Sequence, residues 1–377
     1  MARAPATQEI ETFPEADRLE GAPHPRMTEA LFGHAEAERE LAAALAGGRM
    51  HHAWLLAGPR GIGKATLAYR FAAHALARPD ERDPLAASLQ IDAGSVAARQ
   101  VRALSHPGLL LIRRAYDPQR KRLAQSITVD EVRRIKSFLG HRGAEGAWRV
   151  VIVDEVDELN VSAANALLKS LEEPPERTVF LLVTAAPGRL IPTIRSRCRR
   201  LDLAPLAQAD LQRAVRQALA AEGASEPDEA EWRSLVRLAD GSVGRALGLH
   251  AGGGIALSER IERILAELPR VDWPAAHALA DELAAPQAEG RLELFFELLL
   301  DLLARIVRQA AGGQGGTEER ALAARLVAPD RLASFAELWE TVAREKAETL
   351  ALNLDRKALV LATVARLETA ARAGLAA

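Results

Sequence analysis

The first half of the chain alternates short, continuous apolar runs with longer stretches whose apolar residues recur at helical spacing. In one such stretch Leu67, Phe71 and Ala75 fall at i, i+4 and i+8, which predicts an apolar helix stripe packed against a sheet. The continuous runs do not alternate, which suits parallel strands covered on both faces. The predicted strands are Ala53–Ala57, Leu109–Ile112, Val150–Val153, Thr178–Thr184 and Arg199–Leu203. This order predicts an α/β domain with a parallel sheet.

From Pro205 onward the apolar residues are spaced for helices alone. Residues 209–250 contain three short helical patterns, and the glycines of 252–254 read as a linker. The rest is helical in pattern, and one stripe is spaced for a helix packed on others: Leu292, Phe295, Leu299, Leu303 and Val307. The start of the chain is rich in Pro, Glu, Ala and Arg without apolar periodicity. We therefore predict a disordered arm over 1–26, a sheet domain over 27–204, a three-helix lid over 205–251 and an all-helical collar over 252–377.

Composition and charge exclude several classes of protein. The 377 residues are 49% hydrophobic, enough for two or three domains with real cores. A net charge of −2 argues against a surface wrapped by nucleic acid, so any DNA contact is expected to be local or indirect. The single cysteine, Cys198, excludes an internal disulfide and a zinc site built on several cysteines. We find no pattern of a signal peptide or a membrane span, and expect a cytoplasmic protein.

The strongest chemical motif is a glycine-rich turn between the first apolar run and the helix after it. Its sequence, GPRGIGK over 58–64, has the G-x-x-x-x-G-K spacing of a phosphate-binding P-loop. The glycines Gly58, Gly61 and Gly63 allow backbone N–H groups to close round phosphates, and Lys64 can reach the outer two. The turn therefore predicts a nucleotide site.

The position after Lys64 departs from the motif. A P-loop has Ser or Thr there, whose hydroxyl binds Mg²⁺, but this chain has Ala65 followed by Thr66. The Thr66 side chain points about 100° further round the helix, so we expect it not to replace the missing ligand. We keep Thr66 among the nucleotide-binding candidates. The expected ligand is ATP with Mg²⁺, and its hydrolysis is expected to be weak or absent.

Two carboxylates follow the apolar run that ends at Val153. In a P-loop protein Asp154 can hold the metal ion through water, and Glu155 can orient an attacking water. Thr184, at the end of another predicted strand, is placed to contact a γ-phosphate. Paired acids after a strand also occur as ordinary caps, but the upstream P-loop favours the functional interpretation.

Two clusters of basic residues match no catalytic or binding motif by composition alone. The first consists of Arg113, Arg114, Arg120, Lys121 and Arg122; a solvated loop and a contact with DNA or a partner both remain open. The second, 189–200, contains five arginines, with Arg197 between Ser196 and Cys198. On composition alone, a solvated face explains this stretch as well as a function does.

Residues 27–250 resemble the bacterial clamp-loader subunits of the AAA+ class, specifically the delta-prime subunits of DNA polymerase III. The resemblance rests on the P-loop, on Asp154-Glu155, on the helix 164–175 of sequence ANALLKSLEEPP, and on Ser196-Arg197-Cys198. It implies that Arg197 is offered to ATP held by an adjacent subunit, as a finger that stabilises charge on the transferring phosphoryl group. It also implies that the helical collar joins the subunits.

The departures from this family are informative. Related subunits often carry a four-cysteine zinc module, but 78–107 contains no cysteine, so we expect no zinc and assign no residues to a separate metal site. Motor subunits have Ser or Thr at position 65, and an arginine three residues after the glycine of a Gly-Ser pair. That place is Gly244 here, with Arg245 one step later as a weaker nucleotide-binding candidate. These changes, with Arg197 intact, suit a delta-prime role better than a motor role.

The resemblance implies partners and leaves alternatives. The expected partners are the motor gamma/tau and delta subunits, with the sliding clamp and primed DNA reached through the assembly and no membrane. Because Lys64 and Asp154-Glu155 persist, an ATP-hydrolysing motor subunit or related AAA+ ATPase is the main alternative. A small-molecule P-loop kinase is a weaker one, since nothing in the sequence supplies a lid for an acceptor.

Overall fold

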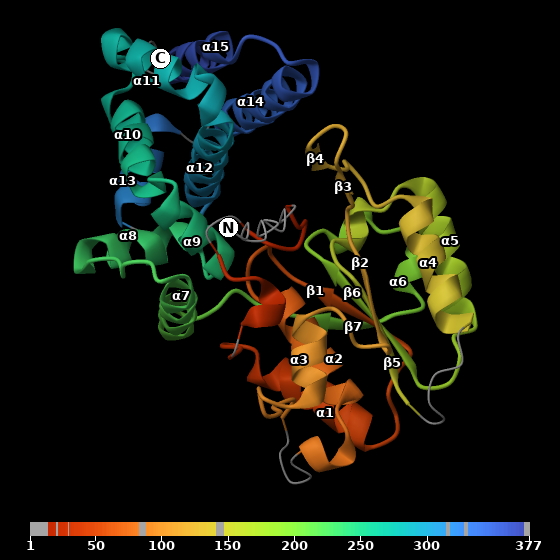
Figure 1. The fold of residues 1–377 in the computed structure, drawn as a ribbon. Coiled ribbons are helices and arrows are strands. Elements are labelled where there is room, and N and C mark those ends of the chain that lie inside the picture. Colours follow the sequence, from red (N-terminus) through yellow and green to blue (C-terminus); the bar gives the residue numbers. More distant parts are fainter. Residues whose placement is uncertain are drawn as a thin grey trace, which may run out of the picture. The chain divides into compact units, whose positions relative to one another are not determined.

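The computed structural model describes residues 14–19, 22–28, 30–82, 88–140, 147–313, 317–327 and 331–372. The chain forms two compact units, Met1–Gly248 and Leu249–Ala377 (Figure 1). By this division the predicted lid lies almost wholly in the first unit, with the sheet. The predicted boundaries at 204 and 251 stay predictions.

A five-stranded sheet in the order β2-β5-β6-β1-β7 organises the first unit, and all its strand pairs are parallel. The strands are β1 Ala53–Ala57, β2 Leu109–Ile112, β5 Arg149–Val153, β6 Thr178–Thr184 and β7 Arg199–Asp202. Every residue of β1 and β6 is buried, because helices cover both faces. The predicted α/β fold with a parallel sheet is confirmed.

The register brings the carboxyl ends of the central strands together. Ala57 pairs with Thr184 on one side and with Asp202 on the other, and Ile112 pairs with Val153. The turns after β1, β5 and β6 therefore leave the sheet side by side at the carboxyl ends of its strands, where ligands of open α/β sheets bind.

Helices lie on both faces of the sheet (Figure 1). One face carries α1 Ala35–Ala46, α2 Lys64–Leu76 and α3 Val96–Arg102; the other carries α4 Val129–Gly140, α5 Val161–Glu172 and the short α6 Pro192–Arg195. On the α4–α5–α6 side, Val151, Val153, Phe180 and Leu182 join one buried apolar cluster with residues of these helices. Successive strand residues face opposite sides, so this cluster takes alternate positions of each strand.

An N-terminal segment also packs on the first unit; we call residues 14–19 and 22–28 the strap. Its short 3₁₀ helix, Pro25–Met27, contacts α2 and α3. Asp17 and His24 are only 9% and 5% exposed. The prediction of a disordered arm through residue 26 is therefore wrong for the strap, because paired polar side chains hold it on the sheet domain. Residues 1–13 lie outside the described residues.

Three helices follow β7, which confirms the predicted three-helix lid. They are α7 Gln208–Glu222, α8 Glu229–Ala239 and α9 Val243–Ala251. Helix α7 ends at Gly223, whose φ of 65° suits glycine. Helix α8 begins at Asp228, which accepts hydrogen bonds from the N–H groups of Ala230 and Glu231.

The second unit is helical throughout its described part. Its helices are α10 Gly254–Glu267, α11 Trp273–Ala284, α12 Glu289–Ala310, α13 Thr317–Leu326, α14 Leu332–Leu352 and α15 Arg356–Arg372. The central helix α12 contacts α10, α11, α13 and α14. Its predicted stripe is buried at Leu292, Phe295, Leu299 and Leu303, each at most 2% exposed, and Ile306 is buried in place of the predicted Val307. The all-helical collar is thus confirmed.

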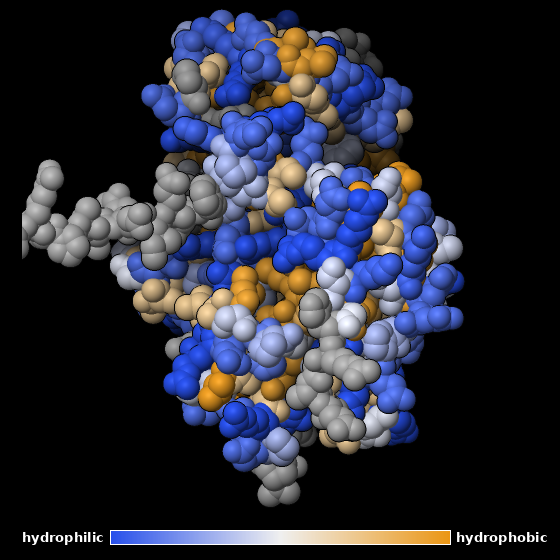
Figure 2. Space-filling view, turned by 45° about the vertical axis from the view of Figure 1, so that its right-hand side comes forward, coloured by the Kyte–Doolittle hydropathy of each residue, from blue (hydrophilic) through white to orange (hydrophobic). Residues whose placement is uncertain are grey.

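The first basic cluster forms part of a small hairpin, with β3 Tyr116–Asp117 antiparallel to β4 Arg122–Leu123. On the face shown in Figure 2, hydrophilic residues predominate and apolar residues gather in patches between them. No helix in the described ranges has the length and apolar character needed to cross a bilayer.

Candidate functional site

The predicted P-loop connects β1 to α2 in a backbone conformation that requires glycine. Gly58, Gly61 and Gly63 have φ values of 154°, 72° and 102°. A Cβ on Gly58 would clash with the carbonyl oxygen of Leu203, so the close approach of the chain after β7 also demands glycine. Helix α2 begins at Lys64, directly after the loop, so its free N–H groups face the turn.

Lys64 is folded back onto the loop. Its ammonium donates to the carbonyl oxygens of Gly58 at 2.7 Å and Pro59 at 2.5 Å, and the residue is 6% exposed. Burial lowers the pKa of Lys64 to about 8, against the opposing charge of Asp154. The lysine is therefore mostly charged at neutral pH. To contact a phosphate it would have to give up its two carbonyl partners.

The acidic pair lies at the carboxyl end of β5 in two environments. Asp154 is buried and accepts a hydrogen bond from the N–H of Glu155 at 3.1 Å. Burial, with the charges of Asp17 and Glu155, raises the pKa of Asp154 to about 7. Glu155 has a φ of 56°, an uncommon conformation for a residue other than glycine.

Glu155 belongs to a cluster of two arginines and two glutamates that the sequence analysis did not predict. Arg60 of the P-loop lies 2.6 Å from Glu155 and 3.0 Å from Glu158. Arg114, two residues after β2, lies 3.3 Å from Glu155 and 2.5 Å from Glu158. Burial raises the pKa of Glu155 and Glu158 adds to this, while the two arginines oppose it. Glu155 must leave these partners before it can orient a water.

Thr184 ends β6 next to the P-loop strand and is fully buried. Its hydroxyl donates to Asp157 at 2.6 Å and accepts from the N–H of Ala186 at 3.0 Å. The single O–H donor of Thr184 is therefore engaged within the protein, and its predicted contact with a γ-phosphate stays a prediction.

The start of α9 packs directly on the P-loop. Ser242 Oγ donates to the carbonyl oxygen of Arg60 at 2.8 Å, and the N–H of Gly244 donates to the carbonyl oxygen of Gly61 at 3.0 Å. A Cβ on Gly244 would lie 3.0 Å from the Gly61 Cα and would clash with the Leu19 side chain. Gly244, which the resemblance aligns with an arginine of the motor subunits, is thus in direct contact with the loop.

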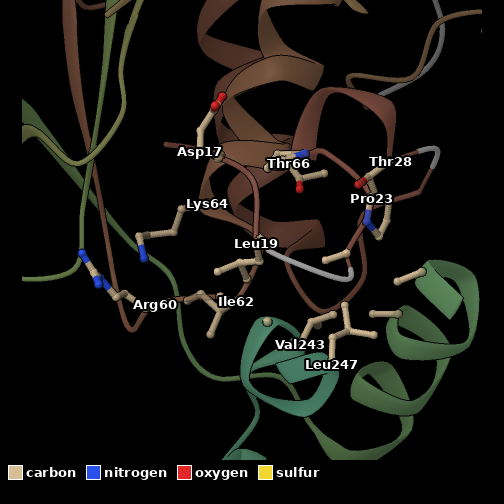
Figure 3. Close-up of a pocket in the computed structure, with 18 of the residues that line it drawn as sticks. Asp17, Leu19, Pro23, Thr28, Arg60, Ile62, Lys64, Thr66, Val243 and Leu247 are labelled. Carbon is tan, nitrogen blue, oxygen red and sulfur yellow. The ribbon is translucent and has the colours of Figure 1, made fainter. Parts of the chain in front are cut away.

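A cavity of about 230 Å³ lies beside these groups (Figure 3). Leu19, Ile62, Val243 and Leu247 form apolar walls, supplied by the strap, the P-loop and α9. The predicted residues that line the cavity are Gly61, Gly63, Lys64, Thr66, Asp154, Glu155 and Thr184, joined by Ala65. Neither Arg245 nor Gly58 is among its described lining residues. The structure thus brings most of the predicted nucleotide-binding residues together.

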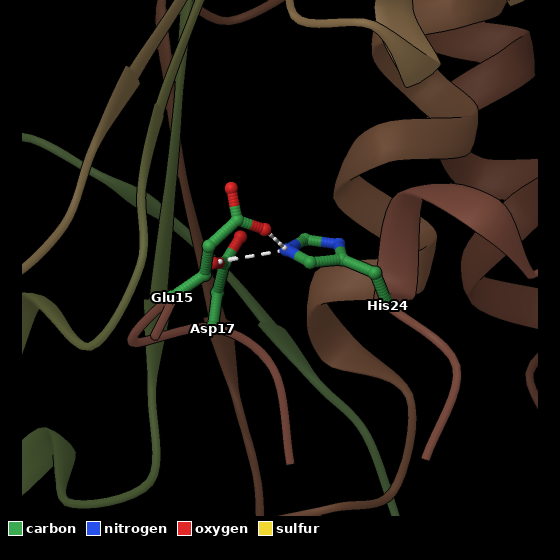
Figure 4. Close-up of side chains that lie close together, drawn as sticks. All are labelled: Glu15, Asp17 and His24. Carbon is green, nitrogen blue, oxygen red and sulfur yellow. Dashed lines mark ion pairs between the residues drawn. The ribbon is translucent and has the colours of Figure 1, made fainter. Parts of the chain in front are cut away.

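The strap is held by a cluster that the sequence analysis assigned no chemistry (Figure 4). His24 Nε2 lies 3.1 Å from an oxygen of Glu15 and from an oxygen of Asp17. Asp17 also accepts a hydrogen bond from the Tyr69 hydroxyl at 2.7 Å. Burial alone would raise the pKa of Asp17, but the hydrogen bond and charge of His24, with Arg113, hold it well below its usual range.

This cluster has the donor spacing of a metal site, but arginines already neutralise it. Glu15, Asp17 and His24 offer ligand atoms within 4.8 Å of one another. Arg113 pairs with both carboxylates, and Arg26 pairs with Glu15 at 2.9 Å. Two guanidinium groups on the same pair of carboxylates supply the positive charge that a cation would bring, so we assign no metal ion here.

Arg197 lies apart from the cavity and is not among its described lining residues. It follows α6, and its side chain is 35% exposed. The guanidinium donates to the carbonyl oxygen of Thr193 at 3.0 Å and to Glu172, at the end of α5, at 2.8 Å. The predicted finger is therefore presented at the surface by two packed helix ends.

Comparison with known proteins agrees with these motifs. Residues 33–207 match the family model described as DNA polymerase III, delta subunit. The chain is 39% identical over 211 residues to DNA polymerase III subunit delta' of Pseudomonas aeruginosa, covering 55% of this chain and 58% of that protein. It is 33% identical over 267 residues to subunit delta' of Escherichia coli K12, covering 71% of this chain and 74% of that protein. Subunit tau of Bacillus subtilis is 31% identical over 230 residues, which cover 60% of this chain and 37% of tau. The chain thus belongs to the delta-prime family of bacterial DNA polymerase III clamp-loader subunits.

Proposed function

We propose that this chain is a non-motor subunit of a clamp loader and supplies Arg197 to ATP bound by an adjacent subunit. The observation that carries the proposal is the position of Arg197, partly exposed and outside the chain's own cavity. A planar guanidinium can bridge two phosphate oxygens, which suits the stabilisation of charge on a transferring phosphoryl group. Arg197 would therefore act in trans, while any role of Glu155 would be within this chain.

The chain's own cavity supports nucleotide binding with little turnover. The loop glycines and Lys64 are retained, whereas Ala65 has no hydroxyl to offer Mg²⁺. Glu155 is held by two arginines. We propose that ATP binds between the P-loop and the apolar walls, with Asp154, Thr66 and Thr184 near its phosphates. Mg²⁺ would be held less tightly than in a site with the hydroxyl.

The proposed partners are the motor gamma/tau and delta subunits, with the sliding clamp and primed DNA reached through the assembly in the cytoplasm. We propose that the helical second unit contacts these subunits, because two apolar side chains near the end of α14 are exposed. Leu352, the last residue of α14, and Leu354, in the turn before α15, are 68% and 52% exposed. A partner that covers such residues would gain the free energy of removing them from water.

Arg197→Ala in the reconstituted assembly tests the proposed function. The clamp- and DNA-stimulated ATPase should fall by the share of the site that Arg197 serves, while assembly and the thermal stability of the isolated chain stay unchanged. Arg195→Ala, an exposed arginine two residues earlier, is the matched control and should leave the ATPase unchanged. An unchanged ATPase in Arg197→Ala, with assembly confirmed, would remove the trans-acting role.

The alternative function is an ATP-hydrolysing motor subunit. The similarity to tau and the retained Lys64 favour it. Steady-state turnover by the purified chain that disappears in Lys64→Ala would establish this alternative. The proposed function expects no such turnover.

A further inference from the structure

The backbone of Arg197 is fixed by a tight turn between buried anchors. The N–H of Arg197 donates to the carbonyl oxygen of Ile194 at 3.1 Å, and the N–H of Cys198 donates to that of Arg195 at 3.3 Å. Ile194 is fully buried, and Cys198 packs against the same apolar cluster. The Cα of Arg197 is therefore well placed, but its long side chain still needs contacts that select one rotamer.

Two contacts select that rotamer, and they leave donors over. Arg197 Nη1 donates to the carbonyl oxygen of Thr193, and Nη2 donates to Glu172 Oε1. A guanidinium has five N–H donors in a fixed plane, so these two bonds leave three in the same rigid fork. The side chain can be held from one side while its remaining donors meet phosphate oxygens.

The partner of Arg197 distinguishes it from other arginines of the 189–200 stretch. Arg199 pairs with Glu40 and lies over the Trp54 ring, and Arg200 pairs with Asp202, two residues away. Arg197 alone among these three is bonded to the end of α5. Glu172, which holds Arg197, therefore belongs to the segment 164–175, whose residues have no chemical role in the proposed function.

We propose that Glu172 is the positioning residue of Arg197. This inference rests on the trans-acting role proposed above. Glu172 holds the guanidinium in the orientation in which its free donors face the neighbouring subunit's ATP. A bond between two half-exposed charges adds little to stability, because water screens it. Its effect is on geometry: without Glu172 the side chain visits other rotamers, and the fraction in position for phosphoryl transfer falls.

The chain offers a matched control in the next residue. Glu173 carries the same charge and is exposed at the end of α5, but the described contacts include no ion pair for it. Replacing either glutamate by glutamine changes the net charge equally. Only Glu172→Gln and Glu172→Ala alter the partner of Arg197, and glutamine keeps an oxygen that can accept from Nη2 whereas alanine does not.

The experiment compares Arg197→Ala, Glu172→Ala, Glu172→Gln and Glu173→Gln in the reconstituted assembly with its motor partners. The readouts are the kcat and KM of the clamp- and DNA-stimulated ATPase, the affinity of assembly, and thermal stability. Arg197→Ala defines the full contribution of the arginine. Glu172→Ala should lower the contribution of Arg197 to kcat roughly 3- to 30-fold, because a misplaced guanidinium costs less rate than a missing one. KM, assembly and stability should stay unchanged. Glu172→Gln should retain most of the contribution, and Glu173→Gln all of it.

The possible results separate this inference from the proposed function. If Arg197→Ala changes nothing, the trans-acting role fails and the inference fails with it. If Arg197→Ala lowers kcat but Glu172→Ala behaves like Glu173→Gln, the trans-acting role stands and the positioning role is overturned. A higher kcat in Glu172→Ala also overturns it, because Glu172 would then restrain the arginine. A loss of assembly or stability in Glu172→Ala, without rescue of kcat by glutamine, would assign Glu172 a structural role instead.

Discussion

The charged side chains of the candidate nucleotide cavity and those around Arg197 differ in how fully they are paired within the chain. In the cavity, Lys64 is bonded to two carbonyls of its own loop and Glu155 is held by two arginines. At the surface, Arg197 is held by two bonds and its side chain stays 35% exposed. One region satisfies its charges internally and would have to rearrange to meet a ligand, whereas Arg197 keeps free N–H donors at the surface. The comparison supports the proposal that this chain serves ATP bound by another subunit rather than its own.

The largest effect is expected at Arg197. Arg197→Lys keeps the charge but loses the planar fork, so it should behave nearly like alanine at the served site. Loss of an arginine finger costs roughly 10³–10⁵ in rate in well-studied GTPases. The measurement is the stimulated ATPase of the assembly, of which only one site's share should be lost. Arg195→Lys is the control, and wild-type activity in Arg197→Lys would mean that a point charge is enough.

The next largest effect is expected at the buried carboxyl group of Asp154 in the cavity. Because the pKa of Asp154 is raised to about 7, the folded chain keeps a proton there that the unfolded chain has lost above its usual pKa of 3.8. The free energy of unfolding should therefore fall as pH rises, by up to about 1.4 kcal/mol per pH unit between pH 4 and 7, and level off above. Asp154→Asn removes this penalty. Denaturant unfolding of the two chains at pH 5, 6 and 7 should show the stability of the variant, relative to wild type, rising with pH. A difference independent of pH would show that Asp154 titrates normally.

A smaller effect concerns the contact between the lid and the P-loop. Gly244→Ala places a methyl group against Leu19 and the Gly61 backbone, and should lower the free energy of unfolding by about 1–3 kcal/mol. Gly248→Ala lies on the same helix with open space around it, and should be neutral or stabilising. Adding Leu19→Ala to Gly244→Ala should restore part of the loss. Equal effects of the two alanines would show that the close approach does not exist in solution.

The smallest effect restores one missing part of the cavity. Ala65→Thr should tighten Mg-ATP binding by roughly tenfold, because the hydroxyl supplies a metal ligand. Ala65→Val has nearly the same shape without the hydroxyl and is the control. Titration with and without Mg²⁺ separates the two contributions. Equal affinities of the threonine and valine variants would show that the missing ligand is not what limits binding.

The sequence predicted the parts of this molecule that local patterns encode. The continuous apolar runs placed the strands, and the spacing of Gly58, Gly63 and Lys64 placed the loop, because each pattern lies within a few residues. Helix α3 was not predicted, since its alanine-rich sequence lacks a strong stripe. The pairing of Arg113 with Glu15, 98 residues away, could not be predicted either. Ion pairs of such separation leave no local signal, and for the same reason the strap was mistaken for a disordered arm.

The sequence predicted which residues belong to the candidate site better than it predicted their hydrogen bonds and ion pairs. The sequence identified Lys64, Asp154, Glu155 and Arg197, but not what each one contacts. Arg60 lies inside the predicted P-loop and Arg114 two residues after a predicted strand. A search for basic residues near the carboxyl ends of parallel strands would have found Arg114. The sequence analysis placed Glu172 only within a motif, because its partner Arg197 lies 25 residues further along the chain, in the turn after α6.

The close approach of the Gly244 and Gly61 backbones should make two distant positions in the chain depend on each other during evolution. A side chain at 244 would require the loop to retreat from the helix, and a side chain at 61 would strain a backbone of φ 72° and collide with Ser242. Relatives that keep this approach should therefore carry glycine at both positions. Relatives with an arginine at the place of Gly244 should have a wider separation between loop and helix, so the two positions should co-vary.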